Sequence, residues 1–119
     1  MRTPVVLFLL TPVLLVAGCA KISAGASDFH RNTPEVMRQY GCPSCHVIPA
    51  VAGASGKVGP SLEGVGQRSY LAGTLPNTPE NMAEWIMHPQ HLRPGTAMPE
   101  MGVTEQDAYR IVEFLERVR

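Results

Sequence analysis

The clearest periodic pattern in the chain lies near its C-terminal end. Apolar residues recur there at the spacing of one helix face, at Ala108, Ile111, Val112, Leu115 and Val118. Thr104 stands before them as a candidate N-cap, and Glu105 and Asp107 place acidic groups in the first turn, where the helix dipole favours negative charge. The pattern predicts a helix that begins directly after Thr104.

A shorter segment with the same periodicity precedes this helix. Thr78, Pro79 and Glu80 form a helix start signal, and an apolar trio follows them at Met82, Trp85 and Ile86. Pro89 lacks a backbone N–H and restricts the residue before it, so the helix should end there. A helix of about ten residues is expected.

A third helix is expected just before the closely spaced cysteines Cys42 and Cys45. Thr33 can cap it, with Pro34 at the first helical position. Its apolar face would consist of Val36, Met37 and Tyr40.

The remaining segments have the composition of loops. Residues 47–75 and 88–102 are rich in glycine or proline and follow neither the helical nor the strand period, with one turn of helix expected at residues 61–65. No segment alternates like a strand, and no internal repeat is visible. We therefore predict an all-α domain with about three main helices and long loops.

The N-terminus carries an apolar run preceded by Arg2. Residues 5–17, VVLFLLTPVLLVA, are too few to span a bilayer and are typical of a secretory signal peptide. The run ends in VAGC, which resembles the cleavage site of bacterial lipoproteins and implies cleavage before Cys19 and diacylation of its sulfur. An uncleaved anchor, or an ordinary signal peptide cut elsewhere, is the alternative.

These observations divide the chain into three parts. We expect a lipoprotein signal peptide at residues 1–18, a lipidated flexible tether at residues 19–32 and a folded domain at residues 33–119. After cleavage, nine basic and ten acidic residues would remain, a net charge of −1 with neutral histidines. No basic stripe is present, which argues against nucleic acid as a partner.

The composition leaves this domain short of core-forming residues. Glycine and proline each occur 11 times, and only 6% of the residues are aromatic. A domain of this size with so many loop formers buries little apolar surface by itself, so another group should help to fill the core.

The sequence Cys42-Pro43-Ser44-Cys45-His46 is compatible with three kinds of site. A thioredoxin-like redox pair would require a βαβ context, whereas the preceding segment has a helical pattern. A structural zinc site would need further ligands, for which the candidates are His30, His88 and His91. A zinc ribbon would leave the long helices and the single tryptophan unexplained.

Covalent haem is the third possibility, and it accounts for the spacing physically. Two thiols one helical turn apart can reach the two vinyl groups at the porphyrin edge, and His46 directly after them then points at the iron. Haem of this type is attached outside the cytoplasm, where the signal peptide would send the chain. Cys42 and Cys45 would form thioethers while Cys19 carries the lipid, so every cysteine has a role. The haem would also supply the apolar bulk that the composition lacks.

The function then depends on the group bound to the iron opposite His46. A thioether there raises the reduction potential and blocks small molecules, which suits electron transfer, whereas an open face suits catalysis or gas sensing. We favour Met98, because the prolines of PGTAMP, residues 94–99, hold its loop. Met101 is the alternative sulfur ligand. Bis-histidine ligation is a further alternative, through His88 or His91.

Four ordered motifs then resemble those of a class I cytochrome c: CPSCH, GPSLEGVGQR, NMAEWI, and PGTAMP before a final amphipathic helix. Residues 73–99 are especially similar to the cytochrome c domain of haem-copper oxidase subunit II. The resemblance covers about residues 33–119 and implies a small class I cytochrome c fold wrapped around one covalent haem c. No counterpart of the oxidase subunit's membrane hairpin or paired-cysteine copper site is visible, so we expect the haem module alone on a lipid tether.

The resemblance also implies individual roles. Met98 would be the distal iron ligand, and the carbonyl of Pro60 would accept a hydrogen bond from the other ring nitrogen of His46. Arg68 would neutralise a haem propionate, and the indole N–H of Trp85 would donate to one. The simpler alternatives are that Arg68 is a solvated charge and that Trp85 is a core residue.

The resulting hypothesis is a monomeric electron carrier rather than an enzyme. It would be lipid-anchored in the cell envelope, periplasmic or on the outer face of a bacterial membrane. It would accept electrons from a quinol-oxidising complex and pass them to a haem-copper oxidase or similar reductase in a respiratory chain. Docking should be brief and weakly steered, because the net charge is near zero. The alternatives are a haem-based peroxidase or gas sensor with a displaceable distal ligand, and a thiol-disulfide oxidoreductase.

Overall fold

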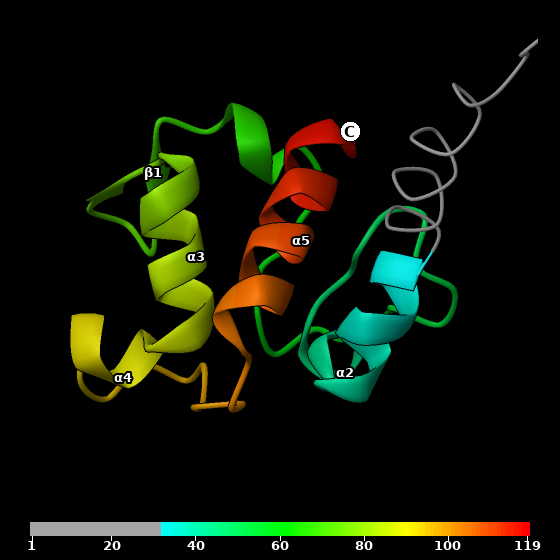
Figure 1. Ribbon diagram of the computed structural model, residues 1–119, viewed down its shortest axis with the longest axis horizontal. Helices are drawn as coiled ribbons and strands as arrows, with labels where there is room; N and C mark the ends of the chain where they lie inside the picture. Colours follow the sequence, from blue (N-terminus) through cyan, green and yellow to red (C-terminus); the bar gives the residue numbers. More distant parts are fainter. Residues whose placement is uncertain (1–31) are drawn as a thin grey trace, which may run out of the picture.

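The computed structural model describes residues 32–119. Helical residues 32–39 are followed by α2 (Cys42–Cys45), the 3₁₀ turn η1 (Val65–Gln67), β1 (Tyr70–Leu71), β2 (Leu75–Pro76), α3 (Pro79–Met87), α4 (Pro89–Leu92) and α5 (Glu105–Arg117) (Figure 1). The fold is small and all-α, as predicted, since each strand has only two residues. The predicted signal peptide, Cys19 and His30 lie outside the described residues. Among residues 32–119, no helix has the length and apolar character needed to cross a bilayer.

Threonine hydroxyls begin the two longer helices where the sequence predicts them. Thr78 Oγ1 accepts a hydrogen bond from the Asn81 N–H at 3.2 Å, and α3 starts at Pro79. Thr104 Oγ1 accepts from the Asp107 N–H at 3.2 Å at the start of α5. Each bond satisfies a backbone donor that has no partner within the first helical turn. Both predicted helix starts are confirmed.

Two predictions about secondary structure were wrong, one on the start of the first helix and one on a segment expected to be loop. Residue 32 is already helical, and the Thr33 side chain is fully buried within the helix instead of capping it. Residues 88–102 were expected to be loop throughout, but α4 begins at Pro89. The fixed φ of proline suits the first position of a helix, so Pro89 starts a new helix after α3 has ended at Met87.

The hairpin of β1 and β2 was not predicted. The strands pair antiparallel, with Tyr70 opposite Pro76 and Leu71 opposite Leu75. Ala72 and Gly73 turn the chain between them in the left-handed region. Strands of two residues are too short for an alternating pattern to show. The single turn of helix, η1, also lies later than the expected residues 61–65.

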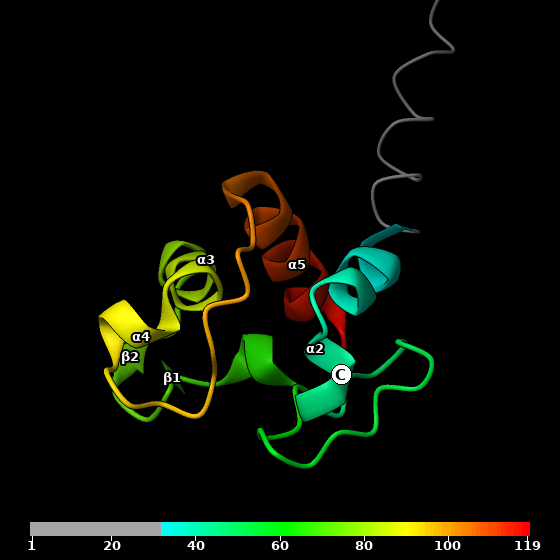
Figure 2. The same ribbon diagram turned by 90° about the horizontal axis from the view of Figure 1, so that it is seen from below.

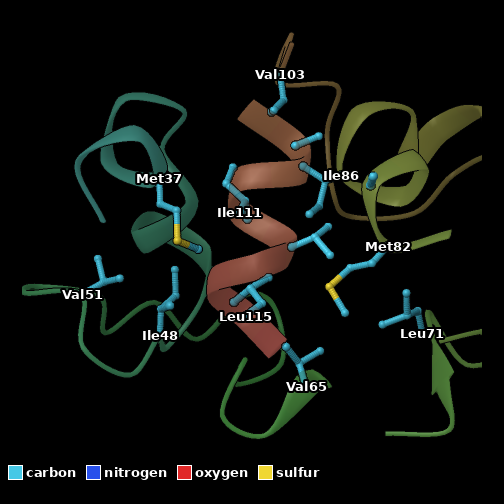
Figure 3. Close-up of a cluster of buried hydrophobic side chains, with 13 residues drawn as sticks. Met37, Ile48, Val51, Val65, Leu71, Met82, Ile86, Val103, Ile111 and Leu115 are labelled. Atoms are coloured by element: carbon cyan, nitrogen blue, oxygen red, sulfur yellow. The ribbon is translucent and has the colours of Figure 1, made fainter. Parts of the chain in front are cut away.

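The hydrophobic core is built around α5. Four of the five residues that the helical spacing placed on one face are buried in it: Ala108, Ile111, Val112 and Leu115. The fifth, Val118, lies just after the end of the helix and is partly buried. The helix packs against α3 and η1. Figure 3 shows Met37 and Ile48 on one side of α5, and Met82 and Leu71 on the other. Full burial of one such side chain is worth roughly 1.5–3 kcal/mol, so these contacts supply much of the stability.

A polar contact joins the segment before α2 to the start of α5. The Tyr40 hydroxyl donates to Oδ2 of Asp107 at 2.8 Å, and the Thr104 hydroxyl donates to the same oxygen at 3.1 Å. Partial burial alone would raise the pKa of the Asp107 carboxyl, but these hydrogen bonds and Arg110 outweigh it and hold the pKa below its ordinary value. The contact therefore adds stability above the pKa of the unfolded carboxyl, and this contribution is lost as the pH falls through the folded pKa.

Replacing Tyr40 tests this contact. We expect Tyr40→Phe to lower the free energy of unfolding by about 1 kcal/mol at pH 7, because the carboxylate loses one donor. The loss should shrink as the pH falls from about 4 through the lowered pKa of the folded carboxyl, because below that pKa the carboxyl is protonated in both states. Urea unfolding at the two pH values measures it. Tyr109→Phe is the matched control, since Tyr109 is an exposed tyrosine of α5. An equal loss in the control, or a loss independent of pH, would contradict the assignment.

Candidate functional site

A cavity of about 460 Å³ lies beside the hydrophobic core, and core residues from both sides of α5 line it, among them Met37 and Met82. Its lining is mostly apolar and comes from α2, α3, α5, the hairpin and the segment between α4 and α5. In Figure 2, α2 lies across from that segment, which runs along the side of α4. The volume falls within the range of about 300–1,000 Å³ that is usual for cofactor sites.

The short helix α2 carries the cysteine motif to this cavity. Gly41, with φ of 77°, turns the chain in the left-handed region and separates α2 from the preceding helix. Because α2 is a single turn, Cys42 and Cys45 lie close together, and His46 follows in extended conformation. All three residues line the cavity. The fold thus brings together the three residues that the motif singles out.

The surroundings of the cysteines disfavour thiol redox chemistry. Burial raises the pKa of the Cys42 thiol, and the neighbouring Cys45 raises it further, against the opposing effect of a backbone hydrogen bond. Redox-active cysteines usually have a lowered pKa and follow a strand. Here the pKa is raised and the preceding segment is helical.

The imidazole of His46 is held in one position by the loop that follows it. Its Nδ1 lies 2.7 Å from the carbonyl oxygen of Pro60. A carbonyl can only accept, so Nδ1 carries the proton and Nε2 keeps the lone pair that can bind a metal. The Gly59 N–H donates to the Cys45 carbonyl at 2.8 Å, and a Cβ on Gly59 would lie 2.3 Å from Cε1 of His46. Only glycine leaves space for the ring there.

Two methionines from the segment before α5 line the cavity, Met98 and Met101. Met101 packs toward the start of α2, since a Cβ added to Gly41 would lie 3.4 Å from its methyl carbon. The Met98 carbonyl accepts a 2.8 Å hydrogen bond from the side chain of Gln90, and Met98 is the less exposed of the two. Both methionines can reach the cavity, and ligation by Met98 stays a prediction.

Arg68 and Trp85 also line the cavity. Nη2 of Arg68 donates to the carbonyls of Ser61 at 2.7 Å and Glu63 at 3.0 Å, which fixes the guanidinium over the loop before η1. Trp85 is half-buried on α3. These positions are compatible with contacts to propionates, which stay predictions for both residues.

The other described histidines lie away from this site. His88 and His91 are exposed and do not line the cavity. His88 Nδ1 is 3.8 Å from a carboxylate oxygen of Glu100. Within residues 32–119, no three histidine, cysteine, aspartate or glutamate side chains lie close enough together to hold a metal ion.

Sequence reasoning missed three residues that shape the site through their neighbours: Gly59, Asn77 and Gln90. Asn77 Nδ2 donates to the carbonyls of Val65 and Arg68 at 2.8 and 2.6 Å and so ties η1 to the hairpin. Single polar residues in loops without periodicity give no sequence signal for such bonds. For Gly59 the only available signal was its place directly before Pro60.

Comparison with known proteins gives one family. The model of the cytochrome c family matches residues 31–119. The chain is 33% identical over 86 residues to cytochrome c oxidase subunit 2 of Alkalihalophilus pseudofirmus, covering 71% of this chain and 24% of that protein. It is 25% identical over 103 residues to cytochrome c oxidase subunit 2 of Bacillus subtilis, covering 82% of this chain and 28% of that protein. The chain thus spans about a quarter of the length of these relatives. No solved structure matches the chain significantly.

The fit between Gly59 and His46 generates a prediction. Gly59→Ala should displace the imidazole and lower the free energy of unfolding by about 1–3 kcal/mol, because the added methyl group overlaps the ring. Gly66→Ala is the control, since its Cβ would lie 2.6 Å from the Glu116 Cα, away from His46. The ring signals of His46 in NMR spectra and urea unfolding measure the two effects. Unchanged His46 signals in Gly59→Ala would contradict the prediction.

Proposed function

Because this chain belongs to the cytochrome c family, we propose that it transfers single electrons through one haem c bound in the cavity. The observation that carries the proposal is the joint position of Cys42, Cys45, His46 and Met98 on the wall of one apolar cavity. When bound, the haem iron supplies the one-electron couple between the ferric and ferrous states. The protein itself forms and breaks no bond in this process, so it acts as a carrier rather than an enzyme.

The residues around the cavity have distinct proposed roles. Cys42 and Cys45 would hold the porphyrin through thioethers, and His46 would bind the iron through Nε2. Met98 would be the second iron ligand and would exclude small molecules. The bond from Nδ1 of His46 to the Pro60 carbonyl keeps the ring oriented and raises its basicity as a ligand.

The edges of the cavity provide polar groups for the propionates. Arg68 and Trp85 both line it. Arg68 has five donor positions, and the two bonds to carbonyls that fix it involve Nη2 alone. We assign Arg68 to charge neutralisation and the Trp85 indole N–H to a propionate hydrogen bond.

We further propose that the protein is a monomer held at the outer or periplasmic face of a bacterial membrane by a lipid on Cys19. The apolar run at residues 5–17 and the VAGC sequence support cleavage of residues 1–18 and leave residues 19–32 as a tether for the domain at 33–119. The relatives named cytochrome c oxidase subunit 2 support a place in a respiratory chain. The donor would then be a quinol-oxidising complex, and the acceptor a haem-copper oxidase or a similar reductase.

Covalent attachment is tested by removing both thiols. The variant Cys42→Ala/Cys45→Ala should lose all haem under denaturing electrophoresis, whereas Ser44→Ala should keep it, because Ser44 is exposed within the same turn. Mass spectrometry should find one haem added to the intact protein and to Ser44→Ala. Haem retained by the double variant, or free thiols in the wild-type protein, would refute the attachment and favour the thiol-disulfide alternative.

Axial ligation is tested by removing each methionine. Met98→Ala should abolish the methionine-to-iron charge-transfer band of the ferric protein and lower the reduction potential. Met101→Ala should retain the band, because its side chain packs toward Gly41. Loss of the band in Met101→Ala alone would reverse the assignment. A wild-type protein without the band that binds cyanide readily would favour the peroxidase or gas-sensor alternative.

A further inference from the structure

The side chain of Gln90 makes three hydrogen bonds to the backbone of the segment that carries Met98. Its Nε2 donates to the carbonyls of Thr96 at 2.7 Å and Met98 at 2.8 Å. Its Oε1 accepts from the N–H of Gly95 at 3.1 Å. Both hydrogens and the oxygen of the amide are therefore engaged on one short stretch of backbone.

Gln90 acts from a fixed position, because α4 is anchored at both ends. Pro89 is fully buried at its start. At its end, the Arg93 guanidinium donates to the Ala72 carbonyl in the turn of the hairpin. The amide of Gln90 thus connects the Met98 segment to a helix that is held by the burial of Pro89 and by the hairpin.

The backbone of residues 95–102, the Met98 segment, has few other restraints. The Glu100 side chain within it accepts from the Gln90 N–H at 3.1 Å and lies 3.8 Å from Nδ1 of His88. Gly95 and Gly102, with φ of 80° and 67°, turn the chain at the two ends of the segment, and nothing lies within 4 Å of a Cβ added to either glycine. Among described residues, the backbone bond from Thr96 N–H to the Arg93 carbonyl at 3.1 Å restrains the start of this stretch. The Met98 carbonyl is held by Gln90.

We propose that Gln90 is a positioning residue that keeps Met98 in the cavity and so closes the sixth position of the iron to outside ligands. The inference rests on the proposed function, because it takes Met98 as the distal ligand. Binding of an outside ligand requires a conformation in which Met98 has left the iron. The apparent affinity for that ligand therefore scales with the population of the detached conformation. The three bonds of Gln90 keep this population small.

The chemistry of the amide allows a sharp choice of variants. Gln90→Ala removes all three bonds. Gln90→Glu keeps the size of the side chain but replaces the donor nitrogen with a carboxylate oxygen that faces two carbonyl oxygens, which is repulsive. Gln67 offers a matched control, because its Nε2 donates to the Glu116 carbonyl at 3.1 Å in the contact between η1 and α5.

The experiment measures the methionine-to-iron charge-transfer band and the binding of imidazole to the ferric haem-bound protein. We expect Gln90→Ala to weaken the band and to bind imidazole about tenfold more tightly than the wild-type protein, and Gln90→Glu more tightly still. Gln67→Ala and Gln67→Glu should match the wild type in both measurements. A general loss of stability would not produce this order.

Each result separates the inference from the proposed function. If the wild-type protein lacks the band, the proposed ligation by Met98 fails. If the band is present and both Gln90 variants bind imidazole as weakly as the wild type, or the Gln67 variants change equally, the role of Gln90 is overturned. Hydrogen exchange of the wild-type protein gives a test that needs no variant. The Gly95 amide should be protected, and exchange at the rate of an unstructured chain would also overturn the proposal.

Discussion

The arrangement of the site depends on the narrow space that the chain leaves for the imidazole of His46. The Pro60 carbonyl accepts from one side of the ring, and Gly59 lies so close that no side chain fits between them. Both residues belong to the loop that returns after α2, and the Gly59 N–H is itself bonded to the Cys45 carbonyl. The loop and the cysteine turn therefore fix each other. One wall of the cavity is set by contacts among residues close in sequence, which explains why a short motif could reveal it.

The opposite wall has a different origin, and the sequence predicted less of it. Helix starts at Thr78 and Thr104 could be recognised because capping is a local signal between residues three apart. The placement of Met98 could be expected only from its prolines and from the family resemblance. What holds its backbone is a side chain on α4, a helix that was not predicted because Pro89 was taken as a breaker alone. Bonds from Gln90 to backbone carbonyls leave no periodic trace in a sequence.

The two walls also differ in how firmly each residue can be held. His46 has a rigid ring with a single hydrogen-bonded nitrogen, and its orientation follows from one contact. Met98 has a flexible side chain with no strong hydrogen-bonding group, so the protein can control its position only through the backbone and through packing. The three bonds of Gln90 act on the backbone alone. Under the proposed function, a thioether ligand therefore depends on the restraint of its loop in a way that an imidazole ligand does not.

The hydrophobic core has two parts, one on each side of α5, and a haem in the cavity would contact both of them. Met37 and Ile48 pack on one side of α5, and Met82 and Leu71 pack on the other. Three of these residues also line the cavity: Met37, Met82 and Leu71. A broad apolar group in that position would contact both halves of the core at once and bury surface that the side chains alone cannot cover. Under the proposed function, attachment of the haem and completion of the core are then one event. An electron carrier gains from this coupling, because a core that closes on the cofactor leaves its ligands little freedom to rearrange when the charge on the iron changes.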